Sequence, residues 1–142
     1  MRVHLADATE LDAMLGRIQN DLFDLGADLA VPQREGKAER LRKFGIEGID
    51  VAFKPLHLAR QQPLTSFVLP GGTPEAAYLH LARTICRRAE RMMVELAAKL
   101  EEPVNEAGIQ YMNRLSDFLF VASRFQNNKG ASDVLWVPGQ NR

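Results

Sequence analysis

The chain has 142 residues but only one cysteine, Cys86, so it cannot form an intrachain disulfide, and a reducing compartment is the simplest interpretation. Basic and acidic residues number 18 each, so no net charge attracts nucleic acid or an anionic membrane. The first residues lack the apolar core of a signal peptide, and no run approaches the roughly 20 apolar residues of a membrane span. We therefore expect a cytoplasmic protein with no nucleic-acid or membrane partner.

Motifs for several common chemistries are also lacking. The three histidines are scattered at positions 4, 57 and 80, and Cys86 has no second cysteine, so the spacing predicts no metal site. Neither GxxxxGK[ST] nor GxGxxG occurs. Hydrophobic residues nevertheless make up 46% of the chain, which is far too high for disorder and fits a single domain over residues 1–142.

Helical periodicity is present throughout, and no strand alternation competes with it. Apolar residues recur at steps of three and four, which place them on one face of a helix. The apolar stripe of the first segment consists of Leu11, Met14, Leu15, Ile18, Leu22, Leu25 and Leu29, and that of the fourth consists of Ile109, Met112, Leu115, Leu119 and Ala122. The second periodic segment contains Gly45, Gly48 and Pro55, which disfavour a helix interior. The pattern predicts four helices, over residues 9–30, 35–60, 73–100 and 105–125. The predicted fold class is therefore all-α, an antiparallel up-down bundle with short connections.

The third helix has the clearest predicted start, with Thr73 as N-cap and Pro74 in the first position. The preceding loop, residues 61–72, contains an apolar run over residues 66–69. That run has no clear strand partner, so we interpret it as a loop segment lying on the bundle. Gly71 and Gly72 favour a tight turn, although two glycines before a helix can also let the backbone approach an anion. The tail after residue 130 reads as short and irregular.

A charged stripe on the third helix is the main candidate for chemistry. Arg83, Arg87, Glu90 and Arg91 share one face, Arg88 lies beside them, and His80 lies one turn earlier on the same side. Guanidinium groups on a rigid helix suit a polyphosphate. The alternative, a solvated face with local ion pairs, is favoured by spacing alone.

The fourth helix has a second polar face, distinct from its apolar stripe. This face contains Asn113, Asp117, Phe120 and Arg124, and arginines of the third helix are possible partners for its buried polar groups. A polar network that only fixes helix register explains the pattern equally well. Cys86 is interpreted as a small packed core residue rather than a nucleophile.

Three ordered motifs resemble the PduO-type ATP:cob(I)alamin adenosyltransferases. They are FVLPGGT at residues 67–73, LARTICRRAER at residues 81–91 and NRLSDFLF at residues 113–120. The segment IQNDLFDLGAD at residues 18–28 is similar to an earlier helix of that family. The resemblance spans about residues 11–124, and it implies that the polar faces form a binding site.

The resemblance implies four helices of a five-helix bundle that forms a homotrimer with active sites between subunits. It implies ATP with Mg²⁺ as one substrate, cobalamin as the other, and a reductase and a B12-dependent enzyme as partners. The residues that it places at ATP are Arg87, Arg88, Glu90, Arg91 and Asn113. Those that it places at cobalamin are Phe67, Arg83 and Phe120, and Arg87 and Phe67 are the implied catalytic residues.

Two motifs of the family are not found in this sequence. They are a triphosphate-wrapping segment of type TRxGDxGxT and a first helix with AxGxxDELN, whose aspartate pairs with the arginine that matches Arg87. We therefore expect a truncated or shortened homologue with less of the phosphate cradle and an exposed apolar patch. The alternative function is a non-catalytic corrinoid or nucleotide-binding relative, a carrier or chaperone.

Overall fold

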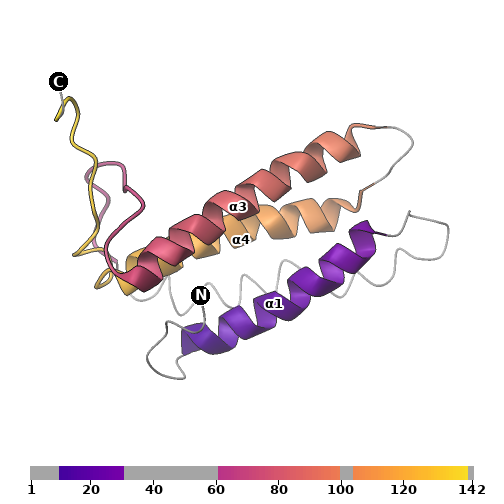
Figure 1. Ribbon diagram of the computed structural model, residues 1–142, viewed down its shortest axis with the longest axis horizontal. Coiled ribbons are helices and arrows are strands. Elements are labelled where there is room, and N and C mark those ends of the chain that lie inside the picture. The colour runs from indigo at the N-terminus through magenta and orange to yellow at the C-terminus, as the bar shows by residue number, and fades with distance from the viewer. Residues whose placement is uncertain (1–9, 31–60, 100–103, 141–142) are drawn as a thin grey trace.

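The computed structural model describes residues 10–30, 61–99 and 104–140, and these contain three helices. They are α1 (Glu10–Leu29), α3 (Pro74–Ala97) and α4 (Glu106–Gln126). Figure 1 shows α3 and α4 side by side, with α1 running alongside this pair. This part of the chain is an all-α bundle, as predicted, and none of its helices is both long and apolar enough to span a membrane. The helix predicted over residues 35–60 lies outside the described residues.

The starts of α3 and α4 follow from side-chain capping. Thr73 accepts a hydrogen bond from the Ala76 amide at 3.2 Å, and Asn105 accepts one from the Ala107 amide at 3.0 Å. Both caps confirm the predicted starts. α3 ends at Ala97, three residues earlier than predicted, because the last turn tightens and the Lys99 amide bonds only three residues back.

Helices α3 and α4 are antiparallel and in a fixed register. Each step toward the C-terminus of α3 is matched by a step back along α4, so Arg83 meets Phe120 and Glu90 meets Asn113. α1 runs in the same direction as α3, as Figure 1 shows. The order is therefore consistent with the predicted up-down bundle.

One apolar core joins all three helices. The predicted stripes supply most of it, but Leu22 and Leu29 of α1 remain 38% and 37% exposed and lie at its edge. α4 is buried over more of its circumference than predicted, because it packs against both other helices. Phe118 and Tyr111 are therefore core residues that the single stripe missed.

The loop before α3 pairs with the C-terminal tail at one end of the bundle (Figure 1). Val68 and Leu135 form an isolated antiparallel bridge. The Leu69 amide donates to the Val134 carbonyl at 2.7 Å, and the Trp136 amide donates to the Phe67 carbonyl at 2.8 Å. The apolar loop segment thus has a partner that was not clear from the sequence, because it is about 70 residues away and the paired segments are too short to show alternation.

Candidate functional site

The predicted charged stripe lies on the outer side of α3 and meets the polar face of α4. Arg87, Arg88 and Arg91 are exposed, and Glu90 is half-buried between the helices. A Glu90 carboxylate oxygen accepts a hydrogen bond from the Asn113 amide nitrogen at 2.7 Å. The structure therefore brings Glu90 and Asn113 together, with Arg87 one helical turn before Glu90, and leaves Arg88 and Arg91 exposed on the same helix.

A second contact ties the same face together. Arg87 donates to the Ser116 hydroxyl at 3.5 Å, and that hydroxyl donates to the Asn113 carbonyl at 2.9 Å. The expectation that arginines of α3 partner Asn113 needs correction, because its side chain bonds to Glu90 instead. Asp117 also differs from that expectation, since it pairs at 3.9 Å with Arg114 of its own helix.

This arrangement suits a ligand that carries both phosphates and hydroxyl groups. Each exposed guanidinium offers a planar fork of donors that matches phosphate oxygens. Because the Asn113 side chain donates to one oxygen of the Glu90 carboxylate, that carboxylate has a preferred direction, and its second oxygen accepts no hydrogen bond from the described residues. Among residues 10–30, 61–99 and 104–140, no group of three acidic, histidine or cysteine side chains is suited to hold a metal.

The first arginine of the charged stripe meets an aromatic ring one turn before Arg87. The Arg83 guanidinium lies 5.0 Å from the centre of the Phe120 ring, a cation–π contact. His80 packs against the same ring, edge to face, with 6.3 Å between ring centres. Arg83 and Phe120, both predicted at cobalamin, are therefore in direct contact.

His80 lies beneath this contact and does not extend the exposed stripe as predicted. It is only 3% exposed, and its Nε2 atom makes no hydrogen bond within the described part of the chain. Burial lowers the pKa of His80, the nearby Arg83 charge lowers it further, and Asp133 opposes both. The imidazole is therefore neutral near pH 7.

Cys86 is a core residue, as predicted. Its thiol is buried and donates to the Met112 carbonyl at 3.2 Å. Burial first, and then the Glu90 carboxylate, raise the pKa of Cys86 to about 12, although Arg87 opposes the shift. The thiol stays protonated at neutral pH and cannot act as a nucleophile.

Phe67 lies apart from the other predicted site residues. The residue is 76% exposed, and its ring contacts Trp136 of the tail, with ring centres 5.9 Å apart. No ring contact joins Phe67 to Phe120 in the part of the chain that the structure describes. The two aromatic residues predicted at cobalamin thus belong to separate contacts, and the sequence did not identify Trp136.

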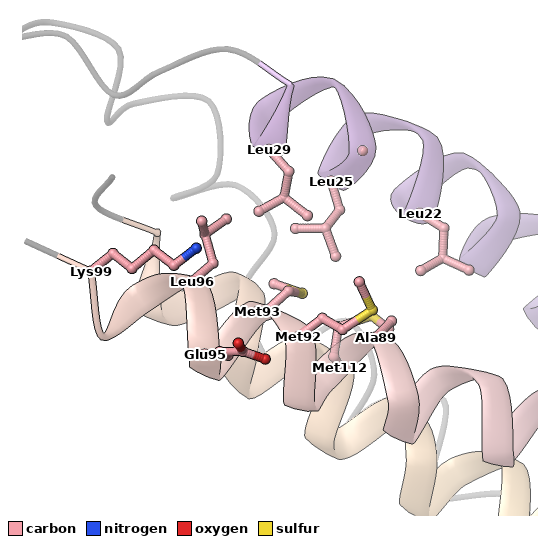
Figure 2. A pocket seen from close by; sticks show the side chains of 11 residues that line it. Leu22, Leu25, Leu29, Ala89, Met92, Met93, Glu95, Leu96, Lys99 and Met112 are labelled. Atoms are coloured by element: carbon pink, nitrogen blue, oxygen red, sulfur yellow. The ribbon is translucent and has the colours of Figure 1, made fainter. Parts of the chain in front are cut away.

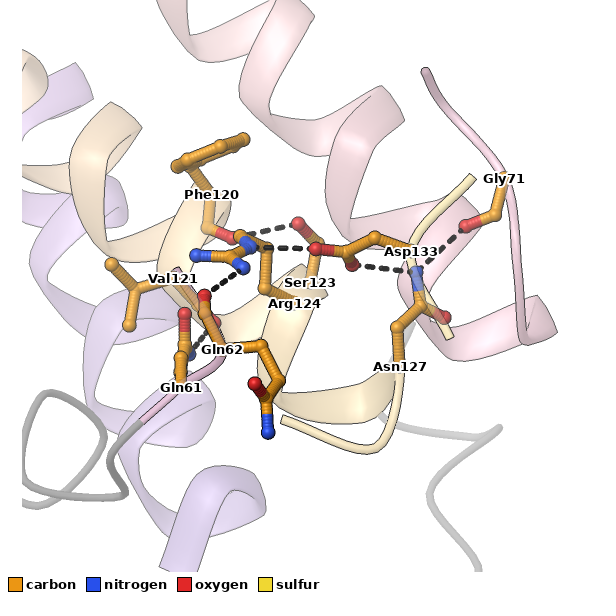
Figure 3. A network of polar contacts seen from close by, with 9 residues as sticks. All are labelled: Gln61, Gln62, Gly71, Phe120, Val121, Ser123, Arg124, Asn127 and Asp133. Carbon is orange, nitrogen blue, oxygen red and sulfur yellow. Dashed lines mark hydrogen bonds and ion pairs between the residues drawn. The ribbon is translucent and has the colours of Figure 1, made fainter. Parts of the chain in front are cut away.

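The end of the bundle also holds a buried polar cluster that the sequence did not predict (Figure 3). Arg124 and Asp133 form an ion pair at 2.7 Å, with side-chain exposures of only 8% and 2%. Asn127 completes it, with hydrogen bonds to Gly71 at 3.1 Å and to Asp133 at 3.4 Å. Gly72 adopts a positive φ of 94°, and a Cβ atom there would collide with Asn127. The glycine pair therefore forms a tight, closely packed turn, the favoured of its two interpretations.

An apolar groove runs between α1 and α3, with α4 as its floor (Figure 2). It consists of two adjoining cavities of about 550 and 400 Å³, which share Leu22, Ala89 and Met112. Ile85 and Met92 on its α3 side are 50% and 64% exposed. Apolar surface is thus exposed here, but the groove contains none of the arginines of the charged stripe.

Comparison with known proteins identifies one family. The family model for cobalamin adenosyltransferase matches residues 1–126. A corrinoid adenosyltransferase of Mycobacterium bovis is 43% identical over 137 residues, which cover 94% of this chain and 69% of that protein. A cobalamin adenosyltransferase of Cupriavidus metallidurans is 45% identical over 128 residues, which cover 89% of this chain and 66% of that protein.

Solved structures show the same likeness. A variant of the PduO-type ATP:corrinoid adenosyltransferase of Lactobacillus reuteri, complexed with cobalamin and ATP, superposes with a TM-score of 0.73 at 35% identity. The match covers 96% of this chain and 74% of that one. Another variant of the Lactobacillus reuteri enzyme, complexed with ATP, gives a TM-score of 0.71 at 36% identity over 89% of this chain and 71% of that one.

Proposed function

The chain belongs to the cobalamin adenosyltransferase family, and on that premise we propose how it transfers the 5′-deoxyadenosyl group of ATP to cob(I)alamin. The proposed nucleotide site is the exposed face of α3 together with Asn113 of α4. One observation carries this assignment: the Glu90–Asn113 hydrogen bond at 2.7 Å, which orients a carboxylate on a helix segment that also exposes Arg87, Arg88 and Arg91.

On the nucleotide side, Arg87, Arg88 and Arg91 bind the triphosphate. Glu90 accepts a hydrogen bond from a ribose hydroxyl, and Asn113 orients Glu90 while contacting the nucleotide. Mg²⁺ enters as the companion ion of ATP, bound mainly through phosphate oxygens. The family's complexes with ATP in Lactobacillus reuteri support a nucleotide site of this kind.

On the corrinoid side, Arg83, Phe120 and Phe67 bind cobalamin. Phe67 and Phe120 present apolar surface to the corrin and exclude its lower ligand, which makes the cobalt easier to reduce. The cation–π contact holds Arg83 and Phe120 as one unit beside the nucleotide face.

The reaction is a displacement at the 5′-carbon of ATP. The cobalt of cob(I)alamin attacks that carbon, a cobalt–carbon bond forms, and the carbon–oxygen bond breaks as triphosphate leaves with its electron pair. The chain's residues orient the two substrates and stabilise the charge on the leaving triphosphate, which is the role of Arg87, Arg88 and Arg91.

We further propose that the active protein is a homotrimer whose sites lie between subunits and that a reductase supplies the electron. The 76% exposure of Phe67 supports the first point, because a ring that excludes a ligand needs a covering surface. The alternative of a non-catalytic carrier or chaperone is not favoured, since the matching relatives are named as transferases.

Chemically reduced cob(I)alamin and MgATP, mixed with the purified chain, test the proposed function. We expect adenosylcobalamin, followed by its absorbance, and an equal amount of triphosphate. Arg87→Ala removes the proposed phosphate contact, and Arg17→Ala on α1 is the control for loss of an exposed arginine elsewhere. Absence of turnover in the unaltered chain would contradict the function, and full turnover by Arg87→Ala would contradict the site.

A further inference from the structure

The buried ion pair at the end of the bundle is built to hold two loops. The Nε atom of Arg124 donates to Asp133 at 2.7 Å, and its Nη2 atom donates to the Gln62 carbonyl at 2.6 Å. The arginine therefore joins the start of the loop before α3 to the start of the C-terminal tail. Because both charged side chains are nearly inaccessible, water does not compete for these bonds.

Asn127 makes the same connection from the other end of the loop. Its side-chain nitrogen donates to the Gly71 carbonyl and to Asp133, and its oxygen accepts from the Thr73 amide at 3.0 Å. The loop over residues 62–71 is thus held at one end by Arg124 of α4 and at the other by Asn127, the residue that caps α4, as Figure 3 shows for Gln62 and Gly71.

Phe67 lies midway along this loop, and the tail fixes its backbone. Asp133 is followed at once by the residues that pair with the loop, so the Phe67 carbonyl accepts from the Trp136 amide at 2.8 Å. On the other side of this pairing, the Ser66 hydroxyl donates to the Trp136 carbonyl at 2.7 Å. A displacement of Asp133 therefore passes directly to the backbone of Phe67.

Burial does not position the Phe67 ring. With 76% of Phe67 exposed, and with Trp136 as its ring neighbour, its place depends on the backbone bonds that hold the loop. This differs from Phe120, whose ring contacts both Arg83 and His80 of α3. A displacement of about 1 Å at a contact with the reacting substrate can cost about 10²-fold in rate.

We propose that Arg124, Asn127 and Asp133 are positioning residues that set the location of Phe67 on the corrinoid side of the active site. This inference rests on the proposed function, and none of these three residues contacts substrate in the proposed site. Their loss alters the corrinoid step and leaves ATP binding intact, because the nucleotide face lies farther along α3.

Three variants and one control test this inference in the full chain. Arg124→Lys keeps the charge beside Asp133 but loses the fork that also reaches Gln62, whereas Asp133→Asn removes the charge. Ser66→Ala removes only the hydrogen bond from Ser66 to the Trp136 carbonyl, at a position outside the apolar core. Ser132→Ala, an exposed change beside Asp133, is the matched control.

Hydrogen exchange measures the backbone link, and kinetics measure its consequence. We expect the Leu69 and Trp136 amides to exchange at least tenfold faster in Arg124→Lys and Asp133→Asn. The corrinoid is supplied as cob(II)alamin and is chemically reduced in the assay. In both variants we expect its KM to rise about tenfold or kcat to fall about tenfold, while the dissociation constant of ATP stays within twofold. The EPR signal of four-coordinate cob(II)alamin with ATP decreases in parallel. Ser66→Ala shows the same changes to a smaller extent, and Ser132→Ala shows none.

The outcomes separate this inference from the function on which it rests. Turnover by the unaltered chain with unchanged corrinoid kinetics and EPR signal in Arg124→Lys would overturn the positioning role alone. Equal losses of ATP and corrinoid affinity would overturn it too, because they indicate general unfolding. If Asp133→Asn does not fold, Arg124→Lys and Ser66→Ala decide the question. Failure of the unaltered chain to turn over would instead contradict the proposed function.

Discussion

Two groups of arginines in this molecule have opposite surroundings. Arg87, Arg88 and Arg91 on α3 are exposed, and of the three only Arg87 has a described partner, the Ser116 hydroxyl at 3.5 Å. Arg124 on α4 is buried, with a carboxylate and a carbonyl at 2.7 and 2.6 Å. The first group has donors to offer a ligand, whereas the donors of Arg124 already serve the fold. The same side chain is thus expected to affect activity in one region and stability in the other.

The largest effect on stability is expected from Asp133→Ala. This change leaves the Arg124 charge buried and unpaired, which lowers the free energy of unfolding by about 3–5 kcal/mol. Urea denaturation measures the loss. A decrease below about 1 kcal/mol would show that the pair behaves like an exposed one and would remove the contrast between the two regions.

Arg87→Ala is expected to show the reverse pattern. Turnover should fall about 10²-fold, because one donor to the leaving triphosphate is lost. The free energy of unfolding should change by no more than about 0.5 kcal/mol, since the side chain is exposed. Paired activity and denaturation measurements check both parts. A large loss of stability would show that Arg87, like Arg124, serves the fold.

Two glycine substitutions compare the polar end of the bundle with α1. Gly72→Ala should cost about 1–3 kcal/mol, because φ is 94° and the new Cβ atom would meet Asn127. Gly26→Ala should stabilise the protein by up to about 1 kcal/mol, because the site is helical and nothing lies within 4 Å. Effects of the same sign would contradict the difference in packing. Thermal denaturation of both variants provides the measurement.

The smallest effect concerns pH. The pKa of His80 is lowered in the folded state by burial and by Arg83, so the unfolded chain binds the proton more readily. The contribution of neutral His80 to the free energy of unfolding should therefore be fully present above the ordinary histidine pKa of about 6.5, and it should be lost as pH falls below that value. The melting temperature of His80→Gln should depend less on pH between 7 and 5. An equal dependence in both proteins would assign the effect to other groups.

Local signals accounted for most of what the sequence predicted correctly. Thr73 and Asn105 fix helix starts through hydrogen bonds within three residues, and Pro74 suits the first helical position, so the starts of α3 and α4 were predictable. The charged stripe was predictable because its members share one helix face. Its meeting with Asn113 was predicted only in outline, since the interhelical register decides that Glu90 is the partner.

The parts that could not be predicted depend on distant segments. Asp133 and Arg124 are nine residues apart across an irregular turn, and Gln62 is 62 residues from Arg124. Neither spacing belongs to a helical or strand period, so periodicity contains no signal for them. One signal was available: the apolar run over residues 134–137 is similar in length to the run over residues 66–69.

The claim that the exposed arginines bind the nucleotide while Arg124 stabilises the fold is tested most directly by the same substitution at two positions. Arg87→Lys and Arg124→Lys are compared for the dissociation constant of ATP and for melting temperature. We predict that Arg87→Lys weakens ATP binding with an unchanged melting temperature, and that Arg124→Lys lowers the melting temperature with ATP binding unchanged. Unchanged ATP binding in Arg87→Lys, together with weaker binding in Arg124→Lys, would contradict it.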